Sequence, residues 1–136
     1  MKRACIVLDK NLSSGQSSNV SAILLGELGT RTQGMFADEP LVDKTGVPHA
    51  AIRCSTIVLA ANSAVQLGNF VANLSGAEGI VYCVFSQYGQ NLHDEPQQYE
   101  AHIKQSQVAD HSLVGVAIWG EYDEVKKLTK KFRLLE

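Results

Sequence analysis

The stretch that decides the fold is residues 3–29, which read RACIVLDKNLSSGQSSNVSAILLGELG. A short apolar run is followed by a turn rich in Ser, Gly and Asn, and then by a segment with helical spacing. A strand that turns directly into a helix directs free backbone N–H groups toward one point, where anions and other ligands bind in α/β proteins. The stretch therefore predicts an α/β fold and a candidate binding site.

The alternation of strand and helix recurs along the chain. Apolar runs rich in Val and Ile occupy residues 4–8, 54–59, 80–85 and 113–118. Short runs of this kind with few charges are typical of strands covered on both faces. Each run is followed by a segment with helical features, and the order strand–helix repeated in this way predicts a three-layer α/β/α sandwich.

The helical segments are recognised by their apolar stripes and their start signals. Ser63 and Gln66 predict a capping box before the second helix, and Pro96 marks the start of the third. The expected stripes are Val20, Ile23, Leu24 and Leu28 in the first helix, Ala64, Leu67, Phe70, Val71 and Leu74 in the second, Tyr99 and Ile103 in the third, and Tyr122, Val125, Leu128 and Phe132 in the last.

Length and charge restrict the class of protein. A chain of 136 residues is expected to form a single α/β domain over residues 1–136. The formal net charge of −2 lacks the basic excess of nucleic-acid-binding domains, which argues against a nucleic-acid partner. Since we find neither a secretory signal nor an apolar run of the roughly 20 residues that cross a membrane, we expect a cytoplasmic protein without a membrane partner.

The cysteines do not indicate a metal site. Cys5, Cys54 and Cys83 each lie in an apolar run and are widely spaced, whereas metal ligands usually come in close pairs. We therefore interpret them as small buried apolar residues. No motif for a metal ion or a cofactor occurs in the chain, and we expect neither.

The first candidate site is the turn at residues 15–19. In one interpretation Gly15, Gln16, Ser18 and Asn19 bind an anion or a carbonyl group together with the free N–H groups of the helix. In the other, Ser17, Ser18 or Asn19 simply caps the helix and nothing else binds.

The second candidate is His49, which lies in a long segment without clear periodicity, residues 30–52. Segments of this length are often functional or contain short elements. Leu41, Val42 and Val47 suggest a small hairpin around a tight turn at residues 43–46. We expect His49 to reach over the turn at residues 15–19 as a base or a hydrogen-bond donor, with Asp43 nearby; the alternative is a loop histidine with one structural hydrogen bond.

The remaining polar groups carry weaker signals. A metal site that pairs any of His93, His102 and His111 would need a third ligand, and we can name none from the sequence. Residues 86–91, SQYGQN, follow the third apolar run. If that strand is parallel to the first, they open on the same sheet edge as residues 15–19, either as part of a site or as a plain polar connection.

Several segments along the chain resemble those of a known family. The patterns IVLDKNLSSGQSSNVSAILLGELG, LVDKTGVPHAAI and STIVLAANSAVQL, followed by GIVYCVF, Tyr99 and LVGVAIWG, are similar to an uncharacterised family grouped with the type II peptidyl-tRNA hydrolases. The resemblance spans residues 3–135. It implies three layers around a small mixed sheet of four strands, and the hydrolase relatives imply a homodimer.

The chain differs from the hydrolases in the turn that carries their catalytic lysine. Those enzymes carry a catalytic lysine in a turn of the G-K-G-K kind, whereas this chain reads Gly15-Gln16-Ser17-Ser18. Loss of the cation removes a Coulomb attraction for tRNA. We therefore expect a protein with the hydrolase-like fold that binds a small anionic or amide-bearing ligand and lacks hydrolase activity. The alternatives are a hydrolase that uses His49 and Asp43, and a pure interaction protein with an exposed apolar patch.

Overall fold

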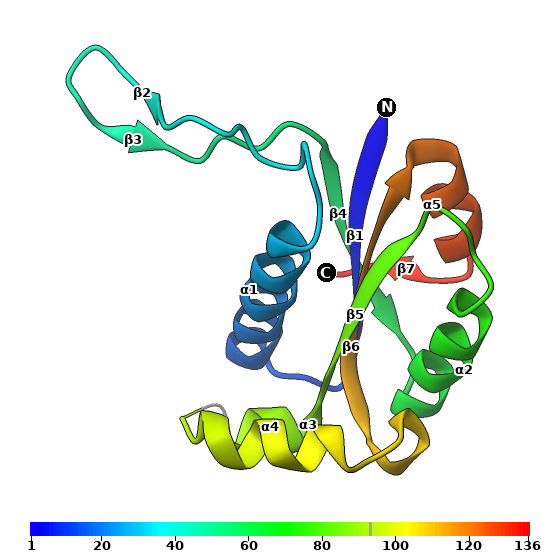
Figure 1. Cartoon of the computed structure of the whole chain (residues 1–136). Helices are drawn as coiled ribbons and strands as arrows, with labels where there is room; N and C mark the ends of the chain where they lie inside the picture. The colour runs from blue at the N-terminus through cyan, green and yellow to red at the C-terminus, as the bar shows by residue number, and fades with distance from the viewer. Residues whose placement is uncertain (93) are drawn as a thin grey trace.

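A computed structural model describes residues 1–92 and 94–136 of the chain (Figure 1). His93, considered above, lies outside the described residues. In chain order the elements are β1 (Lys2–Asp9), α1 (Ser14–Thr30), β2 (Leu41–Val42), β3 (Pro48–His49), β4 (Ser55–Ala61), α2 (Ala64–Leu74), β5 (Val81–Ser86), α3 (Gln87–Leu92), α4 (Pro96–Lys104), the 3-10 turn η1 (Val108–Asp110), β6 (Leu113–Glu121), α5 (Tyr122–Thr129) and β7 (Arg133–Leu134).

The described residues form a mixed sheet of five strands in the order β5-β6-β1-β4-β7, and a separate ribbon of β2 and β3. β1 is parallel to β4, whereas β6 is antiparallel to its neighbours β1 and β5. The expected sheet was mixed but had four strands. The fifth strand, β7, has two residues that pair with Leu59 and Ala60, and a strand this short leaves no periodic signal in the sequence.

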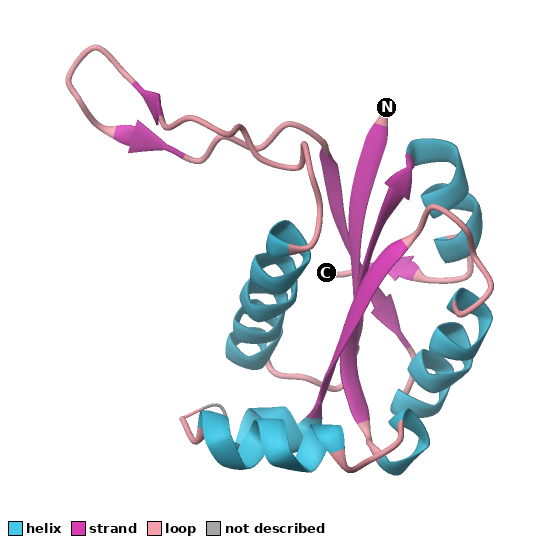
Figure 2. Ribbon diagram, in the orientation of Figure 1, coloured by secondary structure: helices cyan, strands magenta, loops and turns pink. Residues whose placement is uncertain are grey.

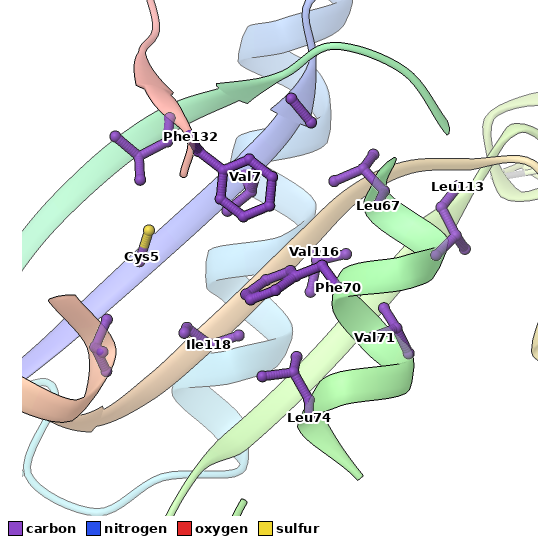
Figure 3. Packing of buried hydrophobic residues seen from close by; sticks show 13 residues of the cluster. Cys5, Val7, Leu67, Phe70, Val71, Leu74, Leu113, Val116, Ile118 and Phe132 are labelled. Carbon is purple, nitrogen blue, oxygen red and sulfur yellow. The ribbon is translucent and has the colours of Figure 1, made fainter. Parts of the chain in front are cut away.

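Helices cover both faces of this sheet (Figure 2). α1 packs on one face through its buried residues Val20, Leu24 and Leu28, against Ala4, Ile6 and Leu8 of β1. α2 and α5 pack on the other face, where Phe70 and Leu74 lie over Val116 and Ile118 (Figure 3). The stripes expected for α1 and α2 are therefore confirmed, because alternate residues of each strand point to opposite faces and each face has a helix to bury it. In the last helix Val125 is buried as expected, but α5 ends at Thr129, so the buried Phe132 lies beyond it.

Residues 86–91 differ from the polar loop expected there. Gln87–Leu92 form the short helix α3, which begins directly at the end of β5. Gly89 is buried there and packs closely against the ring of Phe85. A Cβ at this position would lie 2.6 Å from that ring, so only glycine fits. Its N–H donates to Ser86 Oγ at 3.2 Å. This tight turn depends on contact with a neighbouring ring rather than on a local pattern, so the sequence did not reveal it.

The long segment after α1 forms a two-stranded arm, residues 36–53, that projects from the body of the molecule (Figure 1). Phe36 pairs with Ile52 near its base, and Leu41 pairs with His49 further out. The hairpin expected around residues 43–46 is confirmed, and Gly46 adopts a φ of 87°, a left-handed conformation that favours glycine. Met35, fully buried, anchors the base of the arm to the core.

Candidate functional site

Helix α1 begins at Ser14, directly after its N-cap residue Ser13. Ser13 Oγ accepts the N–H of Gln16 at 3.2 Å, and Gln16 Oε1 accepts the N–H of Ser13 at 2.9 Å. This capping box satisfies two donors that the start of a helix would otherwise leave free. The expectation that Ser17, Ser18 or Asn19 caps the helix was wrong, because the S-x-x-Q pattern at residues 13–16 places the start of α1 earlier. Residues 15–19 therefore belong to the helix itself.

An open pocket of about 430 Å³ lies beside these first turns of α1. It is lined by Ser14, Ser17, Ser18 and Ser21, which we call the serine face, together with Lys10, Leu12, Val58, Leu135 and Glu136. The spacing of these serines, three or four residues apart, places them on one side of the helix. Of the residues expected to bind a ligand, Ser18 lines this pocket; within the described part of the chain Gly15, Gln16 and Asn19 do not.

The serine face offers free hydrogen-bonding groups. Ser17 has only 9% of its surface exposed, yet its hydroxyl has no partner among the residues that the structure describes. Each hydroxyl can donate one hydrogen bond and accept two. Lys10 adds a positive charge near the helix N-terminus, whose partial positive charge also attracts anions. The carboxylate of Glu136 lies at the same pocket, so the ligand meets both signs of charge.

His49 does not reach this pocket. It lies on β3 in the arm, which leaves the body near the C-terminal end of α1, while the serine face is at the opposite end of the helix (Figure 1). The single site that we expected from His49 and residues 15–19 is therefore not formed within this chain. The reason is topological: residues 36–53 pair with each other and extend outward instead of folding back over β1.

The expected proximity of Asp43 to His49 is confirmed. Asp43 Oδ2 lies 2.7 Å from His49 Nε2. Its other oxygen, Oδ1, accepts hydrogen bonds from the Thr45 hydroxyl at 2.6 Å and from the N–H groups of Thr45 and Val47. The hydrogen bond from the Thr45 hydroxyl, followed by that of His49, lowers the pKa of Asp43 below its usual range. Asp43 thus holds the hairpin turn together, with His49 as one of its partners.

We predict an acid-dependent loosening of the arm from this arrangement. Because the pKa of Asp43 is lowered in the folded arm, its hydrogen bonds stabilise the turn at and above the usual aspartate pKa, and this stabilisation is lost as the pH falls through the lower folded value. The NMR signal of the Thr45 amide should therefore titrate below the usual aspartate range. Asp43→Asn should abolish this titration and Asp38→Asn should not; a midpoint at the usual aspartate pKa would contradict the assignment.

A second polar cluster lies where β5 ends. β5 and β1 are both antiparallel to β6, so α3 does begin on the same sheet edge as α1. The ring of Tyr88 stacks on His102, with centroids 3.7 Å apart, and His102 meets His111 edge to face at 5.5 Å. His111 Nε2 is 2.7 Å from Ser106 Oγ. No local sequence pattern joins these residues, because they come from α3, α4 and the segment before β6.

This cluster surrounds a smaller pocket of about 280 Å³. Ser106 Oγ also lies 3.1 Å from the carbonyl oxygen of Ile103, to which it donates. The hydroxyl proton is thus engaged with the backbone, so Ser106 accepts from His111 and is not set up as a nucleophile. Among the described residues, no group of three or more His, Cys, Asp and Glu side chains is placed to hold a metal ion.

The cysteines are separate from both pockets and are free thiols. Cys5 is fully buried, and burial raises the pKa of its thiol to about 12. Burial likewise raises the pKa of Cys83 to about 11. Since the thiolate is the reactive form, these values make both residues unreactive at neutral pH. The interpretation of Cys5 as a buried apolar residue is confirmed, while Cys54 and Cys83 are half-buried.

The fold and the pocket together define a mixed α/β protein with a polar pocket at the start of its first helix. The chain belongs to the family described as "Protein of unknown function (DUF2000)", whose model matches residues 2–136. The solved structure of the protein of unknown function Atu0240, from Agrobacterium tumefaciens strain C58, is similar to it over 98% of this chain and 96% of that chain. The TM-score is 0.78 at 18% sequence identity, a likeness of fold.

No curated protein matches the chain significantly. In the part of the chain that the structure describes, none of the helices combines the length and the apolar character needed to cross a membrane. The resemblance to an uncharacterised family is thus confirmed at the level of the DUF2000 family.

Proposed function

We propose that the protein binds a small ligand that carries an anionic or amide group, and that the pocket beside the serine face is the binding site. The observation that carries this proposal is Ser17, a residue with 9% of its surface exposed whose hydroxyl lacks a partner among the described residues and lines an open pocket of about 430 Å³. A volume in this range is usual for small-molecule sites. Lys10 and the serine hydroxyls suit a carboxylate, a phosphate or an amide oxygen.

We also propose that the pocket binds without hydrolysing. Serine becomes a nucleophile when an adjacent base accepts its proton. Among the described lining residues the titratable side chains are Lys10 and Glu136, and neither forms a hydrogen bond with a serine of the pocket. In the turn where type II peptidyl-tRNA hydrolases carry their catalytic lysine, this chain has Gln16, whose side chain is held in the capping box by Ser13.

The experiment is a thermal-unfolding screen with phosphate, acetate, acetamide and N-acetylated amino acids. A ligand at 100 times its Kd stabilises the folded state by about 2.7 kcal/mol, which raises Tm measurably. The Tm shift should disappear in the double variant Ser17→Ala/Ser18→Ala and persist in Asn19→Ala, a matched polar change on the same helix outside the pocket. A shift that persists without the two hydroxyls, or no shift with any class of compound, would contradict the proposal.

The alternative is a hydrolase that uses His49, and the contact between Asp43 and His49 is the observation in its favour. Both side chains are exposed on the arm, away from the two pockets described above. Turnover of peptidyl-tRNA that is lost in His49→Ala would establish this alternative in place of the binding function. We expect no turnover by the wild-type protein.

A further inference from the structure

The arm, residues 36–53, exposes apolar side chains that the rest of the chain does not cover. All residues from 38 to 50 are exposed. Leu41, Val42 and Val47 each have about half of their surface exposed, and Ile52 and Phe36 follow with 43% and 38%. A two-stranded hairpin alone is at most marginally stable in water. An arm of this composition therefore gains stability from a surface that covers it.

A matching surface lies at the base of the same arm. An apolar groove of about 260 Å³ runs between α1 and the sheet, lined mainly by Ala4, Ile6, Ala22, Leu25, Thr56 and Val58. α1 ends at Thr30, just before the arm, and β4 begins at Ser55, just after it. The groove and the arm are thus neighbours, and the described lining residues of the groove carry no charged side chain.

The groove is bordered by an open strand edge. β7 pairs with β4 only at Leu59 and Ala60, and Leu135 donates to the carbonyl oxygen of Val58. Among the described residues, the first part of β4, residues 55–57, therefore has a strand partner on its β1 side alone. An open edge offers backbone N–H and C=O groups for the addition of another strand.

We propose that two copies of the chain associate by reciprocal docking, with the arm of each copy seated on the groove and the open β4 edge of the other. Because the arm and the groove are adjacent, a two-fold axis between them satisfies both arms and both grooves in one closed dimer. Each copy contributes the eighteen residues of its arm and the eight that line its groove. Taken together, these two sets fall within the roughly 20–30 residues that each partner contributes to a standard interface.

The dimer also affects the serine face. Ser21 and Val58 line both the groove and the pocket of the serine face, so the two hollows are neighbours. An arm of the second copy in the groove forms one wall of that pocket. The dimer does not depend on a ligand, however, and its test is independent of the binding proposal.

The test measures the oligomeric state of the full chain by sedimentation equilibrium. The wild-type protein is expected to be a dimer. Val47→Asp places a charge on the arm, and Ala22→Arg places a charged side chain in the groove; each is expected to raise the dimer dissociation constant by roughly 100-fold or more, since each change occurs twice in the dimer. Val65→Asp on α2, where 73% of the valine is exposed, is the matched control and should leave the dimer intact.

A mixing experiment tests reciprocity. Equimolar Val47→Asp and Ala22→Arg chains retain one intact arm and one intact groove in their mixed dimer, so this dimer should be tighter than either variant alone. All variant sites are exposed, and circular dichroism should show an unchanged fold. A monomeric wild-type protein, a dimer that survives both substitutions, or a mixture no tighter than its components would overturn the proposal.

Discussion

Replacing Phe70 by alanine is expected to lower the free energy of unfolding by about 3–5 kcal/mol, because it removes a buried ring and leaves a cavity. Phe70 is 1% exposed and meets Phe132 edge to face, with ring centroids 5.0 Å apart. It lies over the sheet among residues of β1 and β6 (Figure 3). Urea denaturation should show a lower midpoint with an unchanged slope, since the surface exposed on unfolding stays nearly the same.

The control for this prediction is Tyr82→Ala on β5. Tyr82 is an aromatic residue of a strand, but 38% of it is exposed. Its loss should cost less than about 1.5 kcal/mol, because exposed substitutions remove little buried area and leave no enclosed cavity. Equal losses for the two variants would mean that the cluster around Phe70 does not carry the stability assigned to it.

Replacing Gly115 by valine is expected to lower the free energy of unfolding by a comparable amount. A Cβ at Gly115 would lie 2.7 Å from Leu24 Cδ1 and 2.9 Å from Leu8 Cδ2. Both leucines are fully buried, so their side chains have no room to move. Valine favours strands by up to about 1 kcal/mol, but overpacking costs about 1–3 kcal/mol or more, and here the larger effect decides. We expect a loss of about 3 kcal/mol or failure to fold.

Gly68→Ala is the matched control for Gly115→Val. Gly68 lies within α2, is exposed, and has open space where a Cβ would be. Alanine there should raise the free energy of unfolding by about 0.5–1 kcal/mol, because it favours the helix and restricts the unfolded chain. The two glycine substitutions are therefore expected to change the free energy of unfolding in opposite directions in the same denaturation assay. A tolerated Gly115→Val would contradict the close packing of α1 on β6.

The fold was largely predictable because its main elements have local signatures. Unbroken apolar runs marked β1, β4, β5 and β6, and the periodic stripes marked α1, α2 and α5. The hairpin at residues 43–46 was recognisable from Asp43 and Gly46, whose side-chain acceptor and positive φ serve the turn. β7 and α3 were missed because both are short. β7 depends on pairing with Ala60, which is distant in sequence, and α3 depends on the packing of its Gly89 against the ring of Phe85.

The candidate site was predicted in position but not in composition. The junction of β1 and α1 does carry a pocket, and Ser18 lines it. The side of α1 that faces the pocket is set by the packing of Val20, Leu24 and Leu28 on the sheet, which leaves Gly15, Gln16 and Asn19 outside the lining. His49 was assigned to the pocket because its segment was long enough to reach it. Its pairing with Leu41 directs it along the arm instead, and local patterns do not encode that direction.

Several expectations remain predictions. A single domain rests on the chain length, a cytoplasmic location on the sequence patterns described above, and the absence of a nucleic-acid partner on the net charge. A relationship with the type II peptidyl-tRNA hydrolases rests on the quoted sequence patterns, since the likeness to the Atu0240 structure concerns another protein of unknown function.

The most direct measurement of the binding function is a residue-resolved NMR titration of the wild-type protein with phosphate, acetate and acetamide. At least one compound is expected to shift the amide signals of Lys10, Ser17, Ser18 and Ser21 together, in a saturable manner. Signals of Tyr88, His102 and His111 at the second pocket should stay unchanged. Saturable shifts at the second pocket or on the arm, with the serine face unaffected, would contradict this expectation.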